Sequence, residues 1–250
     1  MNLVLLEPDE IGPDGGALLR GRRAAHVRGT LNARPGMVLR VGVTGGPLGA
    51  AQVVRATERE VSLRCRLETN PPPVPPVDLL LALPRPKVLK RLWAPLASMG
   101  VGRIILTTAW KVDKAYFATH VLSERVYRPL LVEGLEQAGN TRLPLVSVHR
   151  RFKVLVEDQL DRLCPHGARL LAEAGVGPGI PAALGRAGRP ARVLLAIGPE
   201  GGWTAYERGL LHAHGFQSVS AGPRTLRTDT ACVVTLGLVH DALQSPPAGI

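Results

Sequence analysis

Residues 193–202 read VLLAIGPEGG, and residues 216–230 read FQSVSAGPRTLRTDT. Each stretch begins with an apolar run of strand length that stops at a Gly-Pro pair, Gly198-Pro199 in the first and Gly222-Pro223 in the second. Ligands of open parallel sheets bind beyond the carboxyl ends of the strands, and glycine lets the backbone approach a ligand closely. The two strand exits therefore predict a binding site in the last third of the chain.

Charged residues in both exits support a ligand, although each also has an ordinary explanation. Residues 198–202 match neither G-x-x-x-x-G-K-[ST] nor G-x-G-x-x-G, so a plain turn is the alternative there. Glu200 lies in that turn, where a carboxylate is either solvated or paired with an arginine or a ligand hydroxyl. Arg224 and Arg227 precede an expected helix, whose N-terminus disfavours positive charge. An anionic ligand would offset that cost; packing over the preceding loop is the alternative.

The first part of the chain predicts a small β-rich domain. Apolar runs separated by Gly/Pro turns, with a short helix expected over 24–31, indicate a small barrel over residues 1–70. The expected strands are 2–6, 37–43, 50–56 and 60–67. The proline-rich residues 71–77 then predict a stiff, extended linker.

Residues 78–250 predict an α/β domain with a mostly parallel sheet, because strands alternate with helices. The expected strands are 78–83, 102–107, 143–148, 168–172, 193–197 and 216–221. The expected helices are 87–99, 123–138, 152–163, one starting at the capping box of Thr204 and Glu207, and one from about Thr228 to Leu243. Residues 175–189 are rich in Gly, Pro and Ala and predict a surface loop.

The composition indicates a cytoplasmic protein that binds a polyanion. The net charge of +11 is local, since residues 84–153 hold 13 Lys/Arg against 4 Asp/Glu. Such an excess suits nucleic acid, although a genome rich in arginine codons would also produce it. Three scattered cysteines and seven histidines without ligand spacing predict neither a disulfide framework nor a metal site. No apolar run approaches the length of a membrane span, about 18 residues.

Two motifs carry a resemblance to a known family. Residues 197–202 (IGPEGG) followed by 221–231 (AGPRTLRTDTA) resemble the RsmE family, the uracil-N3 methyltransferases of small-subunit ribosomal RNA in the SPOUT superfamily. Residues 136–144 (EQAGNTRLP) are similar to its central element, and residues 26–36 weakly resemble part of its N-terminal PUA-like barrel. Ala109-Trp110 falls where the family usually has a loop with Ser and Arg.

The resemblance implies a trefoil knot over residues 193–243, S-adenosylmethionine (SAM) bound in the knot, and a homodimer whose site borrows from the partner. The cofactor would be held by the backbone of the two strand exits and by the loop near Leu171. The residues that the resemblance assigns to the cofactor are Leu171, Leu195, Ile197, Gly198, Pro199, Gly201, Gly202, Gly222, Leu226 and Thr228.

The implied reaction assigns roles to the charged residues. Uracil N3 is a poor nucleophile until it loses its proton, so the site must stabilise negative charge on the ring. Arg227, with Arg224 as second choice, is expected to supply that charge or to grip a phosphate, and Glu200 is a candidate proton acceptor. The residues expected to hold ribosomal RNA, free or in the small subunit, are Arg28, Arg85, Lys87, Lys90, Arg91 and Arg142.

Two alternatives remain open at this stage. One is a SPOUT methyltransferase that modifies a different RNA nucleotide. The other is a non-catalytic RNA-binding protein that has kept the fold.

Overall fold

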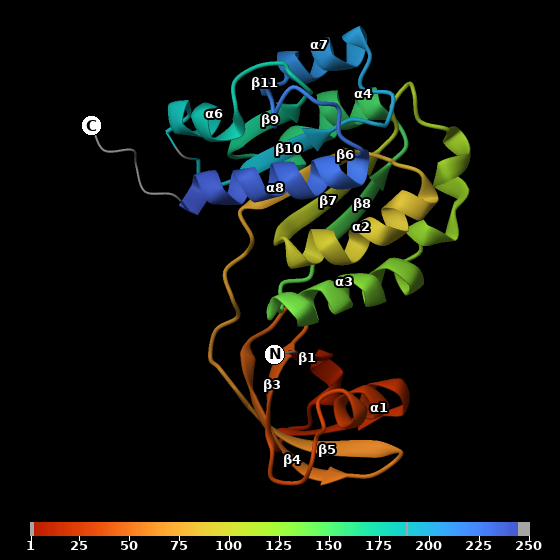
Figure 1. Ribbon diagram of the computed structural model, residues 1–250, viewed down its shortest axis with the longest axis vertical. Coiled ribbons are helices and arrows are strands. Elements are labelled where there is room, and N and C mark those ends of the chain that lie inside the picture. Colours follow the sequence, from red (N-terminus) through yellow and green to blue (C-terminus); the bar gives the residue numbers. More distant parts are fainter. Residues whose placement is uncertain (1–2, 189, 245–250) are drawn as a thin grey trace. The chain divides into compact units, whose positions relative to one another are not determined.

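The computed structural model describes residues 3–188 and 190–244, and it divides into two compact units. Unit 1 comprises Met1–Val74 and Leu131–Leu143, and unit 2 comprises Pro75–Leu130 and Pro144–Ile250. Figure 1 shows the helices and strands of both units.

Unit 1 is built on a five-stranded mixed sheet with the order β1-β3-β4-β5-β2. Side chains alternate between core and solvent along β4 and β5, so that Ala51, Val53, Val61 and Leu63 face inward. The helix α1 packs on β2 and β5. The elements are β1 (Val4–Leu6), a 3-10 turn (Pro8–Glu10), β2 (Gly16–Arg20), α1 (Gly21–Gly29), β3 (Val38–Val43), β4 (Leu48–Ala56) and β5 (Glu60–Leu67).

The segment Leu131–Leu143 joins unit 1 although it follows unit 2 residues in the chain. The Glu136 carboxylate accepts a hydrogen bond from the Leu5 N–H at 3.0 Å. The Thr141 hydroxyl donates to the Gly46 carbonyl oxygen at 2.6 Å, and Arg40 donates to the carbonyl oxygen of Gly139. The sequence motif at 136–144 therefore fastens the returning chain to β1, β3 and the β3–β4 turn.

Unit 2 confirms the predicted α/β class with a parallel sheet. Its six strands pair only in parallel, in the order β11-β9-β10-β6-β7-β8. Every residue of the central strands β6 and β10 is buried, as expected where helices cover both faces. The strands are β6 (Val77–Ala82), β7 (Val101–Thr107), β8 (Leu145–His149), β9 (Ala168–Ala172), β10 (Val193–Ile197) and β11 (Phe216–Val219).

Two helices lie together over one face of this sheet. Figure 1 shows α2 beside α8, and α8 also packs on β10 and β6. The helical segments are α2 (Pro86–Ser98), 3-10 turns at Lys114–Ala118 and His120–Leu122, α3 (Glu124–Ala138), α4 (Phe152–Val154), a π segment (Leu155–Gln159), α5 (Leu160–Leu163), α6 (Ile180–Arg186), α7 (Ala205–Ala213) and α8 (Thr228–Gln244). No helix within residues 3–188 and 190–244 is long and apolar enough to cross a membrane.

One sequence prediction is wrong in unit 2. Residues 175–189 were expected to be a surface loop, but Ile180–Arg186 forms α6. Ile180, Ala183 and Leu184 recur at helical spacing, and all three are buried where α6 packs against α8. The small-residue composition concealed this short apolar face.

Candidate functional site

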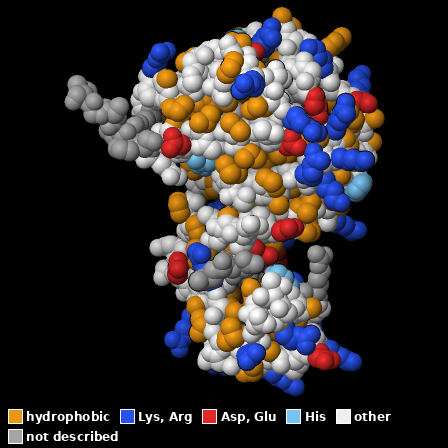
Figure 2. All heavy atoms as spheres, in the orientation of Figure 1, with side chains coloured by type: hydrophobic (Ala, Val, Ile, Leu, Met, Phe, Trp, Pro, Cys, Tyr) orange, Lys and Arg blue, Asp and Glu red, His pale blue; other side chains and the backbone are white. Residues whose placement is uncertain are grey.

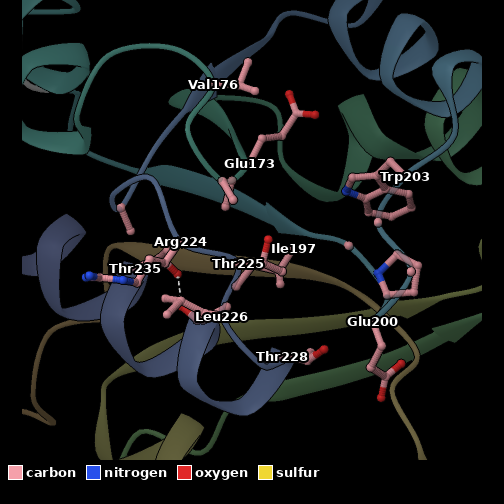
Figure 3. Close-up of a pocket in the computed structure, with 18 of the residues that line it drawn as sticks. Glu173, Val176, Ile197, Glu200, Trp203, Arg224, Thr225, Leu226, Thr228 and Thr235 are labelled. Atoms are coloured by element: carbon pink, nitrogen blue, oxygen red, sulfur yellow. Dashed lines mark hydrogen bonds between the residues drawn. The ribbon is translucent and has the colours of Figure 1, made fainter.

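A cavity of about 440 Å³ opens at the carboxyl ends of β9, β10 and β11. Three chain segments line it, namely 172–176 after β9, 197–203 after β10 and 221–228 after β11, together with Lys111, Arg208, Ala231 and Thr235. Figure 3 shows side chains from all three segments gathered around the end of β10, where Ile197 lies. The volume falls in the range of small-molecule sites.

The glycine loop, defined as Gly198–Trp203, is held by contacts from elsewhere in unit 2. The Gly202 N–H donates to the Pro199 carbonyl oxygen at 2.8 Å, and Lys111 Nζ donates to the Gly201 carbonyl oxygen at 2.6 Å. The Arg85 N–H lies 3.4 Å from the Glu200 carboxylate, which is otherwise exposed. A Cβ atom on Gly198 would lie 3.0 Å from the Trp203 ring, so a side chain here would require that ring to shift by a few tenths of an ångström.

The predicted capping box at the start of α7 is confirmed, and it also fixes a neighbouring loop. The Glu207 carboxylate accepts from the Thr204 N–H and hydroxyl, each at 2.8 Å, and Thr204 Oγ1 accepts from the Glu207 N–H. The other carboxylate oxygen of Glu207 accepts from the Trp110 N–H at 2.7 Å. Glu207 is only 4% exposed. Its buried carboxylate therefore joins the 109–111 loop to Thr204, the residue that follows the glycine loop.

The arginine loop, defined as Ala221–Arg227, is much freer. Gly222, with φ of +129°, is tied to Ser220 and to the Gly175 N–H. From Pro223 to Arg227 every residue is exposed, and no side chain there makes a hydrogen bond or ion pair within the described chain. Arg224 lines the cavity but Arg227 does not. In Figure 3 Arg224 lies on the side of the cavity opposite Glu200.

The segment after β9, residues 172–176, belongs to a polar network that the sequence did not reveal. The Ser218 hydroxyl donates to the Glu173 carboxylate, and Arg208 forms an ion pair with it at 3.6 Å. His212 lies 3.3 Å from Ser218 and 2.8 Å from the Phe216 carbonyl oxygen. Their spacing in the sequence gave no signal, because pairing of β11 with β9 brings Ser218 beside Glu173.

The structure brings most of the expected cofactor residues to the cavity, with two exceptions. Leu171 and Leu195 do not line it, because their fully buried side chains belong to the strand core. The cavity begins one or two residues further along each strand, at Ala172 and Ile197. The other expected residues do line it: Ile197, Gly198, Pro199, Gly201, Gly202, Gly222, Leu226 and Thr228.

Four of the six residues expected to bind RNA lie at the start of α2, beside this cavity. Figure 2 shows Lys and Arg side chains clustered where the N-terminal ends of α2 and α8 meet. We call this the α2/α8 basic surface; its exposed residues, at the N-terminal ends of these two helices, are Arg85, Lys87, Lys90, Arg91 and Arg227.

Two of the six expected RNA-binding residues are engaged with other groups. Arg91 pairs with Asp229 at 2.9 Å. In unit 1, Arg142 donates to the Pro72 carbonyl oxygen, whereas Arg28 is exposed.

The thiols do not supply a nucleophile to this site. Burial raises the pKa of Cys232 to about 12 and that of Cys164 to about 11, with nearby Asp229 and Asp78 adding to the respective shifts. Among the described residues, no three His, Cys, Asp or Glu side chains come together as a metal site.

Comparison with known proteins identifies relatives over almost the whole chain. A family model described as an RNA methyltransferase domain matches residues 70–240. The ribosomal RNA small subunit methyltransferase E of Treponema pallidum is 33% identical, with 96% of this chain and 92% of that protein covered. The protein of the same name from Mycobacterium bovis is 28% identical, with 91% and 87% covered.

Solved structures share the fold at lower identity. A ribosomal RNA small subunit methyltransferase E from Neisseria gonorrhoeae bound to S-adenosyl methionine superposes with a TM-score of 0.75 at 19% identity, covering 95% of each chain. A putative methyltransferase from Legionella pneumophila in complex with SAM has a TM-score of 0.71 at 22% identity, covering 96% of this chain and 97% of that one.

Proposed function

This chain belongs to the ribosomal RNA small subunit methyltransferase E family, and we propose that it transfers a methyl group from SAM to N3 of a uridine in small-subunit (16S) ribosomal RNA. One observation carries the proposal. The two motifs that mark the family in the sequence, the glycine loop and the arginine loop, face each other across a single cavity. A basic surface lies directly beside that cavity, where a polyanionic substrate would bind.

The cavity's residues fit SAM. Ile197, Pro199 and Leu226 offer apolar contacts for an adenine ring, and the Glu173 carboxylate suits hydroxyl groups or a positively charged amine. The indole N–H of Trp203 is buried in the cavity wall without a partner among the described residues. Side chains at Gly198 and Gly201 would crowd Trp203 and Lys111, so both glycines keep the wall open. When bound, SAM supplies the electrophilic methyl group.

The chain's own residues would then prepare the uracil. Methyl transfer is an in-line displacement, so holding the base at the cavity mouth supplies much of the rate. We assign Arg227, with Arg224 as second choice, to the negative charge that develops on the ring as N3 loses its proton. Glu200 is exposed at the mouth, which allows it to accept that proton.

The knot and the domain boundaries are also part of the proposal. We propose that residues 193–243 form a trefoil knot; the insertion of β10 between β9 and β6 and the return of α8 onto both central strands support this. We propose that unit 1, whose strands lie within residues 1–70, is a PUA-like RNA-binding domain. Residues 71–77 would be the linker, and 78–250 would carry the SPOUT domain apart from the returning segment at 131–143.

We also propose a homodimer that acts in the cytoplasm, where ribosomal RNA is the substrate. Support for the dimer comes from exposed apolar side chains on α8, Val233 and Val234, which a second copy would cover. Sedimentation equilibrium of the purified chain measures the oligomeric state directly.

The testing experiment follows labelled methyl from SAM into small ribosomal subunits that lack native modifications, with the modified nucleotide mapped. Incorporation at N3 of a single uridine is the expected result. Incorporation at another base would keep the chemistry and change the target. No incorporation, together with no SAM binding by calorimetry, would favour a non-catalytic RNA-binding protein.

A further inference from the structure

Trp110 is an exposed aromatic side chain that the folded chain does not use. It is 83% exposed, the highest value among the exposed large apolar side chains of the described residues. Its indole makes no hydrogen bond or ring contact within residues 3–188 and 190–244. The other two tryptophans are buried, Trp93 completely and Trp203 at 5% exposure. Aromatic residues make up only 4% of the chain, and among them only Trp110 and Tyr206, at 61%, are exposed.

The backbone that carries this side chain is fixed. The Trp110 N–H donates to buried Glu207 at 2.7 Å, and the Val112 N–H donates to the Ala109 carbonyl oxygen at 3.0 Å. The next residue, Lys111, donates to the Gly201 carbonyl oxygen and lines the cavity. The indole is therefore presented by a rigid loop one residue from the cavity wall.

The charges around Trp110 indicate what covers it. Lys111 adjoins it in the chain, Lys114 follows at the start of a 3-10 turn, and both are exposed. Single-stranded RNA is held by basic grooves combined with aromatic side chains on which bases stack. An exposed indole without a hydrogen bond or ring contact among the described residues, with Lys111 and Lys114 close to it in the chain (and one acid, Asp113, between them), beside a residue that lines the cavity, matches that combination.

We propose that Trp110 is a stacking platform for an unpaired base of the ribosomal RNA substrate and positions the strand so that the target uridine reaches the cavity. The inference rests on the proposed function, because it takes ribosomal RNA as the ligand. Trp110 is a positioning residue and takes no part in the chemical step.

The structure supplies a direct measurement, since Trp110 is the exposed one of three tryptophans. We expect addition of protein-free, unmethylated small-subunit ribosomal RNA to quench the fluorescence of the full chain and to protect it from acrylamide. In Trp110→Phe, where only the buried tryptophans remain, both responses should disappear. An indole that stays open to acrylamide in the RNA complex would overturn the proposal.

Variants separate stacking from other contacts. Trp110→Ala and Trp110→Leu should each weaken RNA binding roughly tenfold or more, whereas Trp110→Phe should stay near the wild type. The slope of log affinity against log salt should not change in these variants, since no phosphate contact is lost; Lys114→Ala should reduce the magnitude of that slope by about 0.7, the value for one phosphate contact on a single strand. Wild-type binding by Trp110→Ala would contradict the proposal.

Three further outcomes separate failure of this inference from failure of the proposed function. If Trp110→Leu behaves as wild type while Trp110→Ala fails to dimerise in sedimentation equilibrium, Trp110 belongs to an interface between copies of the chain, and the inference is wrong. If the wild type binds the RNA but transfers no methyl group, the proposed function fails while quenching still decides the role of Trp110. If the wild type binds neither this RNA nor small ribosomal subunits that lack native modifications, both fail.

Discussion

The glycine loop and the arginine loop face the same cavity, but only the first is held by other parts of the chain. Lys111, Arg85 and the capping box at Thr204 all fix the glycine loop. From Pro223 onward, the arginine loop offers exposed side chains without partners in the described chain. Preorganised backbone suits a cofactor that binds in one way, and unpaired arginines suit an anionic substrate that arrives later. We therefore expect changes in the first loop to alter cofactor binding and stability, and changes in the second to alter turnover.

The largest expected effect lies in the arginine loop. Arg227→Ala should lower kcat by roughly 10²–10³-fold, the cost of removing one donor that stabilises developing charge, while SAM affinity stays unchanged. Single-turnover methyl transfer and calorimetry measure the two quantities. Arg224→Ala is the competing variant; if it alone slows the reaction, the role belongs to Arg224. A loss of RNA affinity without a loss of kcat would instead indicate a phosphate contact.

The next effect lies in the glycine loop. Gly198→Val would force a side chain against Trp203, and overpacking of this kind costs about 1–3 kcal/mol. SAM affinity measured by calorimetry should fall accordingly. Gly201→Val is the matched comparison and should lose less affinity, because its side chain would meet Lys111, whose flexible side chain can move. Equal losses in both variants would show that the loop tolerates no side chain, whatever its neighbour.

A smaller effect is expected when two threonines are compared, one directly after the glycine loop and one in the arginine loop. Thr204→Ala removes the N-cap of α7 and should lower the free energy of unfolding by about 1 kcal/mol. Thr225→Ala removes an exposed hydroxyl without a partner in the described chain and should stay within about 0.5 kcal/mol of the wild type. Urea unfolding measures both. A Thr225→Ala effect as large as that of Thr204→Ala would mean that the arginine loop is also fixed.

The sequence predicted this region well because its signals are local. Gly-Pro pairs after apolar runs mark strand ends, and a capping box marks a helix start. The cavity therefore lies where residues 193–230 indicated. Leu171 and Leu195 lie in the strand core and do not line the cavity, and sequence periodicity does not say where a parallel strand leaves the core.

What the sequence did not reveal depends on contacts between distant residues. Ser218 meets Glu173 only because β11 pairs with β9, and Glu136 meets Leu5 only because the chain returns to unit 1. β2 was missed because only Ala17 and Leu19 alternate inward. Arg91 was expected to bind RNA, and nothing in the sequence indicated its partner Asp229, which is 138 residues away in the chain.

The ion pair of Arg91 with Asp229 should give the smallest effect. It lies directly after the arginine loop. Partial burial raises the pKa of Asp229, but hydrogen bonds from the Thr230 N–H and Arg91, with the charges of Arg227 and Arg91, outweigh it and hold the pKa below its usual value. A carboxylate with a lowered pKa in the folded state stabilises the fold above its unfolded pKa, about 3.9. That contribution is lost as pH falls through the folded pKa.

Arg91→Ala should therefore lower the free energy of unfolding at pH 7 by less than about 1 kcal/mol, with the difference from wild type vanishing in acid below the folded pKa. Urea unfolding over a pH series measures it, with Lys90→Ala as the control from the same helix. A difference that persists unchanged in acid would mean that Arg91 acts through packing. Because Asp229 opens α8 directly after the arginine loop, releasing it would also place an unpaired negative charge beside Arg227. A fall in kcat of Arg91→Ala at unchanged RNA affinity would then show that this ion pair keeps Arg227 available to the substrate.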